Sequence, residues 1–160
     1  MRLRRPQPVP EVRLVERDDV YRVYFHGPAY RVLDRAWHAG DAVVGVMPET
    51  LPPNHTPTDR PLLAAPRLVE LCFQTAGLRE IGETGRMGLP HRVDRIRFLR
   101  DAWTARGRLH AVVRPGATPG TFDARVVDEA GDVFVSVEGY ATVALGEVDA
   151  GLLWGVETGT

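Results

Sequence analysis

The segment APRLVELCFQTAGLREIGETG, residues 65–85, gives the strongest indication of the fold of this chain. Pro66 suits the first turn of a helix, where its missing N–H needs no partner, and Gly82 and Gly85 end the segment. Residues of one broad face recur with the i, i+3, i+4 spacing of a helix: Leu68, Leu71, Cys72, Thr75, Leu78 and Arg79, widened by Val69, Phe73 and Ala76. The spacing predicts a helix over about residues 66–81, and so broad an apolar arc indicates that other structure surrounds it.

Short segments with strand-like alternation flank this helix in the sequence. They cover residues 13–25 (with a turn at 17–19), 41–48, 91–99, 108–115, 121–128 and 133–145. The last two form the clearest hairpin, whose turn at residues 128–132 contains a glycine available for positive φ. One long, mostly buried helix with short antiparallel strands predicts an α+β domain in which the sheet curls around the helix, the hotdog architecture.

Composition is that of an ordinary globular domain. The chain has 160 residues, 44% of them hydrophobic, and a formal net charge of −1, which suits one domain with a real core. Near-neutral charge offers no electrostatic basis for binding nucleic acid or an anionic membrane, and no apolar run approaches the roughly 20 residues that span a bilayer. No apolar region follows the N-terminal basic residues, so we expect no secretory signal and a cytoplasmic protein.

The two ends of the chain differ from its middle. Three prolines and three arginines in residues 1–10 predict a flexible lead-in, which leaves 11–146 as the folded domain. Residues 147–160 are rich in glycine and predict a largely frayed tail. Its candidates for docking on the domain are Leu152, Leu153 and Trp154.

Glu70 and Gln74 carry the most chemical information. Glu70 lies in the first turns of the apolar helix, where the helix dipole favours a carboxylate and burial favours the protonated acid. A carboxyl group balanced in this way can act as a general acid or base, although an exposed edge position fits the spacing equally well. Gln74 lies four residues later on the same face and can orient the carboxyl group, but by itself it is more typical of an ordinary surface glutamine.

Two turns containing proline add further candidates. In FHGPAY, residues 25–30, a Gly-Pro turn lies between aromatic residues, and His26 can point toward the core or away from it. In LPHRV, residues 89–93, His91 follows the proline and is typical of a polar edge residue. No histidine pair has metal-ligand spacing beside an acid, so we expect no metal, and the single cysteine, Cys72, is expected to pack in the core rather than act as a nucleophile.

Taken in order, these segments resemble the dehydratase domain of polyketide synthases, in particular its C-terminal half. That domain is a double hotdog, and its second unit carries Tyr-x-Tyr-Gly-Pro-x-Phe, Asp-x-x-x-Gln/His and Leu-Pro-Phe-x-Trp motifs. YFHGPAY at 24–30 matches the first, with His26 and Tyr30 at substituted positions, and ELCFQ at 70–74 matches the second, with Glu in place of Asp. LPHRV at 89–93 matches the third only at its first two positions.

The resemblance, which spans about residues 20–145, implies an activity and the residues that carry it. The family is a hydro-lyase that removes water from a 3-hydroxyacyl thioester held on the phosphopantetheine of an acyl carrier protein, and no other cofactor is implied. Glu70 would take the aspartate's role at the leaving hydroxyl, Gln74 would position it, and Tyr24 would assist, with His26 beside them. The implied substrate-binding residues are Phe25, Gly27, Pro28, Tyr30, Phe73, Leu89, Pro90 and His91.

One feature of the family is missing from this sequence. The family's α-proton base is a histidine in a His-x-x-x-Gly-x-x-x-x-Pro motif of the first hotdog, and the segment from His38 to Pro48 does not fit that motif. We therefore expect a partner hotdog, in a homodimer or heterodimer, to supply the base, with an acyl carrier protein as the other partner. Two alternatives remain open: an acyl-thioesterase in which Glu70 activates water, and a non-catalytic, dehydratase-like binding or scaffold subunit.

Overall fold

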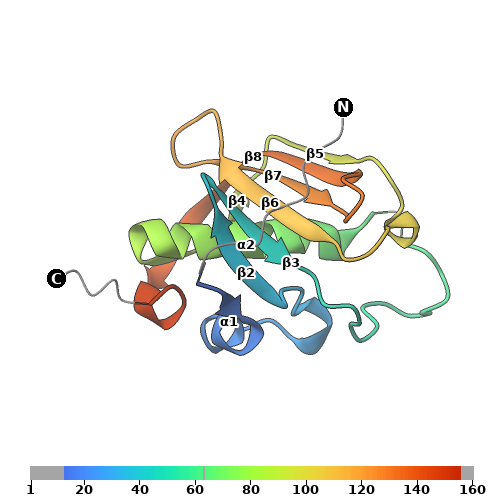
Figure 1. Cartoon of the computed structure of the whole chain (residues 1–160), viewed down its shortest axis with the longest axis horizontal. Helices are drawn as coiled ribbons and strands as arrows, with labels where there is room; N and C mark the ends of the chain where they lie inside the picture. The colour runs from blue at the N-terminus through green and yellow to red at the C-terminus, as the bar shows by residue number, and fades with distance from the viewer. Residues whose placement is uncertain (1–12, 63, 156–160) are drawn as a thin grey trace.

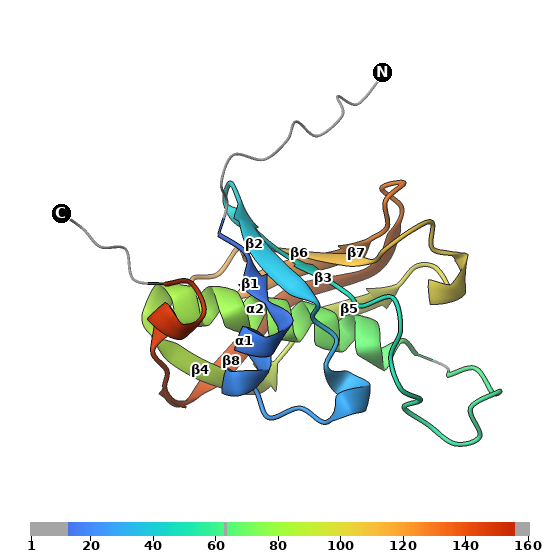
Figure 2. The same cartoon turned by 60° about the horizontal axis from the view of Figure 1, so that its bottom comes forward.

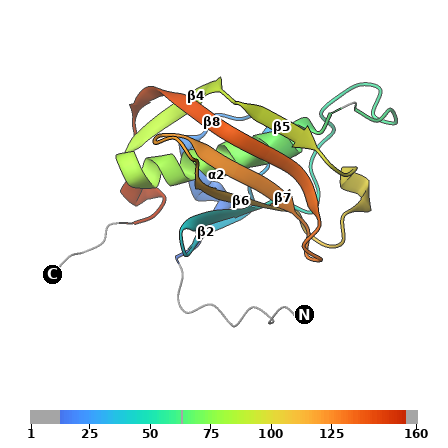
Figure 3. The same cartoon turned by 90° about the horizontal axis from the view of Figure 1, so that it is seen from above.

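A single long helix, α2 (Pro66–Thr84), forms the centre of the computed structural model, which describes residues 13–62 and 64–155. An antiparallel sheet curls around this helix (Figures 1 and 3). The predicted α+β architecture, with a sheet wrapped around one central helix, is confirmed. The helix runs slightly beyond the predicted range and ends at Gly85, whose left-handed backbone closes it.

Eight strands make up the sheet within the described residues. They are β1 (Val15–Glu16), β2 (Arg35–Ala39), β3 (Ala42–Val46), β4 (Arg86–Arg92), β5 (Arg95–Phe98), β6 (His110–Pro115), β7 (Phe122–Val127) and β8 (Val133–Glu147). Their order is β1-β2-β3-β6-β7-β8-β4. The long strand β8 pairs with β7 along one edge and with β5 and then β4 along the other. The strands expected over 41–48, 108–115 and 121–128 are therefore present as β3, β6 and β7.

The predicted hairpin at residues 128–132 joins β7 to β8. The buried Asp128 holds this turn, because one carboxylate oxygen accepts hydrogen bonds from the backbone N–H groups of Ala130 and Asp132, both at 3.0 Å. Its other oxygen accepts from the backbone N–H of Arg106 at 2.9 Å. These amide donors, that of Arg106 first, lower the pKa of Asp128, because they favour its charged form.

Core packing explains why α2 lies inside the sheet. Buried residues occur all around the helix between Leu68 and Ile81, including the polar Gln74 and Thr75. At Gly45 of β3 the sheet comes especially close, since a Cβ there would overlap the Thr75 side chain. Removal of this much apolar surface from water, rather than helix propensity alone, stabilises the helix.

The segment expected as a strand over residues 13–25 is instead mostly helical. Only Val15–Glu16 forms a strand, and the predicted turn at 17–19 is the first turn of α1 (Arg17–Val23). Acidic Asp18 and Asp19 lie in that first turn and Arg22 in the last, which suits the helix dipole. The strand prediction was wrong because the segment buries Val20 from α1 and Tyr24, the C-cap residue four positions later, whose N–H donates to the Val20 carbonyl oxygen.

Three further boundaries differ from the prediction. The sequence analysis missed β2, because its residues RAWHA include no β-branched residue and its position depends on pairing with β3. The strand expected over 91–99 is two strands, β4 and β5, which begin at Arg86 and at Arg95. Gly82 does not end α2 but lies within it, at a point where a Cβ would overlap the Trp154 ring.

The C-terminal segment, expected to be largely frayed, packs on the C-terminal end of α2 through residue 155 (Figure 2). It forms a short 3-10 turn, η3 (Ala150–Leu152), after which Leu153 is 2% exposed. The Trp154 indole N–H donates to the Leu78 carbonyl oxygen at 2.9 Å. Of the docking candidates, Leu153 and Trp154 are packed, whereas Leu152 is 62% exposed. The predicted lead-in at 1–10 lies outside the described residues.

None of the helices in the described part of the chain has the length and apolar character needed to cross a membrane.

Candidate active site

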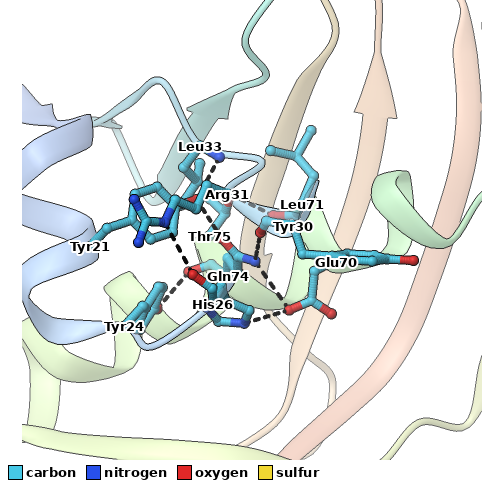
Figure 4. Close-up of polar contacts among 10 residues, drawn as sticks. All are labelled: Tyr21, Tyr24, His26, Tyr30, Arg31, Leu33, Glu70, Leu71, Gln74 and Thr75. Carbon is cyan, nitrogen blue, oxygen red and sulfur yellow. Dashed lines mark hydrogen bonds and ion pairs between the residues drawn. The ribbon is translucent and has the colours of Figure 1, made fainter. Parts of the chain in front are cut away.

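The Glu70 carboxylate is the centre of a polar cluster between α2 and the segment that follows α1 (Figure 4). Glu70 lies in the second turn of α2, and its side chain is 26% exposed. Its Oε1 atom lies 3.0 Å from His26 Nε2 and accepts a hydrogen bond from Gln74 Nε2 at 3.2 Å. The carboxylate is thus held at one oxygen by two neighbours.

Gln74 is a buried positioning residue and not the surface glutamine that its type alone favoured, since it is only 3% exposed. Its amide nitrogen donates to the Tyr30 carbonyl oxygen at 2.8 Å as well as to Glu70. Its amide oxygen accepts from the Tyr21 hydroxyl at 2.8 Å. With both kinds of amide group engaged, the nitrogen is fixed on the side of Glu70.

Two tyrosines of the N-terminal segment support this arrangement. The Tyr21 hydroxyl donates to Gln74 and accepts from the Leu33 backbone N–H at 2.9 Å. The Tyr24 hydroxyl donates to the Gln74 main-chain carbonyl at 2.8 Å. Burial raises the pKa of both phenols, so both stay protonated as donors at neutral pH. Tyr21 therefore belongs to the site, although it was not among the predicted site residues. It lies on α1, in the segment that was expected to be a strand.

His26 lies in the short segment between α1 and η1 (Pro28–Tyr30), packed edge-on against Tyr24 with ring centroids 5.4 Å apart. Its Nδ1 atom is buried and has no hydrogen-bond partner among the described residues. The remaining nitrogen, Nε2, contacts Glu70. The imidazole and the carboxyl group are therefore within hydrogen-bond distance of each other, at the range over which a side chain can pass a proton to its neighbour.

A small pocket of about 80 Å³ opens beside this pair. Predicted site residues that line it are Tyr24, Phe25, His26, Glu70, Phe73, Gln74, Leu89 and Pro90. Lining residues that the sequence analysis missed are Gly77, Met87, Gly88 and Tyr140. Phe73 stacks on Tyr140, with ring centroids 4.2 Å apart, to form one wall.

The other predicted substrate-binding residues lie away from this pocket. Gly27 is the N-cap of η1 and Pro28 its first residue. Tyr30 contributes its carbonyl oxygen to Gln74 rather than its ring to the pocket. His91 is exposed on β4 and does not line the pocket. A larger hollow of about 670 Å³ lies at the N-terminal end of α2, and no predicted site residue lines it.

The cluster provides acid–base chemistry. Cys72 is buried, and burial raises the pKa of its thiol to about 12, so it carries no thiolate for nucleophilic attack at neutral pH. In the described ranges, no three His, Cys, Asp or Glu side chains gather closely enough to hold a metal ion. What the arrangement offers is a held carboxyl group, a histidine in contact with it, and apolar walls.

The family model of the polyketide synthase dehydratase N-terminal domain matches residues 3–151. The chain belongs to the polyketide synthase dehydratase family. The matching model describes the N-terminal domain, whereas the motifs indicated the C-terminal half, so the assignment to one half stays a prediction. Among curated proteins, none matches the sequence.

Solved dehydratase structures share the hotdog fold of this family member. A trans-AT polyketide synthase dehydratase domain from Brevibacillus brevis is similar with a TM-score of 0.68 and 19% identity, over 83% of this chain and 49% of that one. The dehydratase domain of the CurF module of curacin polyketide synthase has a TM-score of 0.64 and 21% identity, over 82% and 48%. The dehydratase domain from the terminal module of the rifamycin polyketide synthase has a TM-score of 0.60 and 18% identity, over 85% of this chain and 48% of that one. The chain thus spans about half the length of these domains.

Proposed function

We propose that this chain is a dehydratase subunit that removes water from a 3-hydroxyacyl thioester carried on the phosphopantetheine of an acyl carrier protein. The observation that carries the proposal is the Glu70 carboxyl group, held by His26 at 3.0 Å and Gln74 at 3.2 Å beside a pocket with apolar walls. Among the similar structures, two CurK dehydratase variants are described as inactive, one with an aspartate changed to asparagine and one with a histidine changed to phenylalanine. The acid of such a domain corresponds in this proposal to Glu70, and the histidine comes from a second hotdog.

Each residue of the cluster has a role in this proposal. Elimination requires a base that takes the α-proton and an acid that protonates the leaving β-hydroxyl, while the C–H electrons form the double bond and water departs. Glu70 is the acid at the hydroxyl, and Gln74 and His26 are positioning residues that hold it. His26 touches Glu70 directly, so both groups stand on the same side of a bound substrate, and the α-proton base has to come from elsewhere.

A second hotdog is the proposed source of that base, and the order of the motifs supports the proposal that this chain is the C-terminal type of unit. The chain spans about half of the dehydratase domains that it resembles. Among the described strands, β4 pairs with β8 alone, so that its other edge has no neighbour within residues 13–62 and 64–155. Phe25, beside the pocket, is 74% exposed. Free strand edges and exposed aromatic side chains are features that a partner covers. A homodimer or heterodimer with another hotdog would close the pocket there.

The experiment that tests this proposal compares the wild-type chain with the Glu70→Gln variant. Each is assayed on the 3-hydroxybutyryl and the butyryl thioester of pantetheine. Every assay is run both alone and with a second hotdog from the same synthase. We expect water loss from the hydroxy substrate that Glu70→Gln lowers by about 10²–10⁴-fold. The control is Glu83→Gln, which changes a half-exposed carboxylate on the same helix and should leave the rate unchanged.

The other outcomes point to the alternative functions. Release of free thiol from the butyryl thioester, lost in Glu70→Gln, would identify a thioesterase. No turnover of either thioester, alone or with the second hotdog, would overturn the enzyme proposal and leave a scaffold subunit. A stable monomer in solution at micromolar concentration that is fully active would contradict the need for a partner.

A further inference from the structure

Strand β8 contains a bulge at the point where it passes the candidate site. Val135 and Val137 are buried on the helix side of the sheet, so strict alternation would place residue 139 on that side next. In the register with β7, however, Val137 lies opposite Ala124 and Tyr140 opposite Phe122. Three positions on β8 therefore span two on β7, and the extra residue changes the alternation so that Tyr140 faces the helix.

Gly139 is the residue that makes this bulge possible. Its φ of 66° is in the left-handed region, which residues with a Cβ rarely adopt. A Cβ at this position would also overlap the Asp94 carboxylate. The Gly139 N–H donates to the Asp123 carboxylate at 2.9 Å, so the bulged residue has a specific partner. Bulges beside active sites commonly redirect one side chain, and here that side chain is Tyr140.

Tyr140 is a buried residue whose hydroxyl group forms no hydrogen bond with another described side chain. The residue is 3% exposed, lines the pocket that contains Glu70, and is held in place by its stack on Phe73. Tyr21 and Tyr24 donate to Gln74, whereas none of the side-chain hydrogen bonds among the described residues involves the Tyr140 hydroxyl. Its oxygen is also not one of the fully buried atoms without a partner, so it keeps some contact with the open space of the pocket. Burial, with Glu70 and Glu80 nearby, raises the pKa of Tyr140, so its hydroxyl remains a donor.

We infer that the Tyr140 hydroxyl donates a hydrogen bond to the thioester carbonyl oxygen of the acyl group bound beside Glu70. The inference rests on the proposed function, in which Glu70 acts on the other substrate oxygen, the β-hydroxyl. Removal of the α-proton shifts negative charge to the carbonyl oxygen, and a protonated phenol in a pocket with little water stabilises that charge. Tyr140 is then a substrate-contacting residue that the elimination requires.

Tyr140→Phe is the test, because it removes only the hydroxyl and keeps the ring that stacks on Phe73. With 3-hydroxybutyryl-pantetheine we expect kcat/KM to fall about 10- to 100-fold, mostly through kcat, while the thermal midpoint stays unchanged. The control is Ser136→Ala, which deletes a hydroxyl group from the same strand at a position opposite Arg97 and Arg125, away from the pocket. Unchanged kinetics in Tyr140→Phe would overturn the inference.

A binding measurement separates this inference from the proposed function. Butyryl-pantetheine has the thioester carbonyl but no β-hydroxyl, and its affinity can be measured in the Glu70→Gln background, where no turnover is expected. We expect Tyr140→Phe to weaken this binding about 5- to 30-fold even if the wild-type chain never dehydrates a substrate. Equal affinity with and without the hydroxyl group would overturn the carbonyl contact, whatever the outcome of the Glu70 assay.

Discussion

Gln74 shows how much one buried amide decides in this protein. It binds the Glu70 carboxylate, the Tyr30 carbonyl and the Tyr21 hydroxyl at the same time. Each of those groups comes from a different segment, so the amide holds α1, the η1 turn and α2 in one arrangement. A buried polar group with all its partners in place specifies geometry more than it adds stability, because the loss of one partner leaves the others unpaired.

At the same scale, Asp128 makes stability depend on pH. The pKa of Asp128 in the folded protein is below its usual value. The charged carboxylate therefore stabilises the folded state above about pH 5, and this stabilisation is lost as the pH falls through the lowered pKa. Asp128→Asn removes the charge and places an amide N–H₂ or a single oxygen where three backbone donors converge. We expect the variant to be less stable than wild type at pH 7, with a difference that shrinks below about pH 4.

Urea unfolding at several pH values measures this difference. Asp59→Asn, in an exposed loop, is the control and should follow the wild-type curve at every pH. A gap between wild type and Asp128→Asn that is the same at pH 7 and at low pH would show that the charge of Asp128 is not the cause.

Helix α2 shows how packing at the scale of an element reverses a local preference. Gly77 lies in the middle of the helix, where alanine is intrinsically better by about 1 kcal/mol. A Cβ at this position, however, would overlap the Tyr24 hydroxyl, which donates to the Gln74 carbonyl. We expect Gly77→Ala to lower the free energy of unfolding by about 1–3 kcal/mol, because Tyr24 must move. Denaturant unfolding measures this change.

The Tyr24→Phe background is the matched control for Gly77→Ala. Removal of the hydroxyl group takes away the atom that the new methyl group would meet, so the cost of Gly77→Ala should be smaller there than in the wild type. Equal costs in the two backgrounds would show that Tyr24 is not what excludes a side chain at this position.

For the whole molecule, the C-terminal segment closes one end of the sheet-wrapped helix. Leu153 is buried in the core, and Trp154 bonds to Leu78 and stacks at a tilt on His38 of β2, with ring centroids 4.3 Å apart. We expect Leu153→Ala to cost about 2–4 kcal/mol of unfolding free energy. Leu152→Ala, at the exposed neighbour, should change it by less than about 0.5 kcal/mol. Similar thermal midpoints for the two variants would contradict the docking of this segment.

Features that depend on local pattern could be predicted from the amino-acid sequence. The apolar face over residues 65–85 predicted the central helix, and the turn at 128–132 predicted the hairpin. The spacing of Glu70 and Gln74 placed both on one helix face, because residues four apart always share a face. The helix prediction was correct because its segment is long and strongly periodic. The hairpin prediction was correct because the turn depends on a few neighbouring residues.

Contacts between side chains that are distant in the sequence follow from the three-dimensional packing. His26 reaches Glu70 across 44 positions of sequence, and Tyr140 faces the same pocket because a bulge at Gly139 changes the alternation of β8. Short segments such as α1 and β2 have weak local preferences, so their conformation follows from what they pack against. Register, bulges and packing between distant segments are collective properties of the whole chain, and the site is assembled from them.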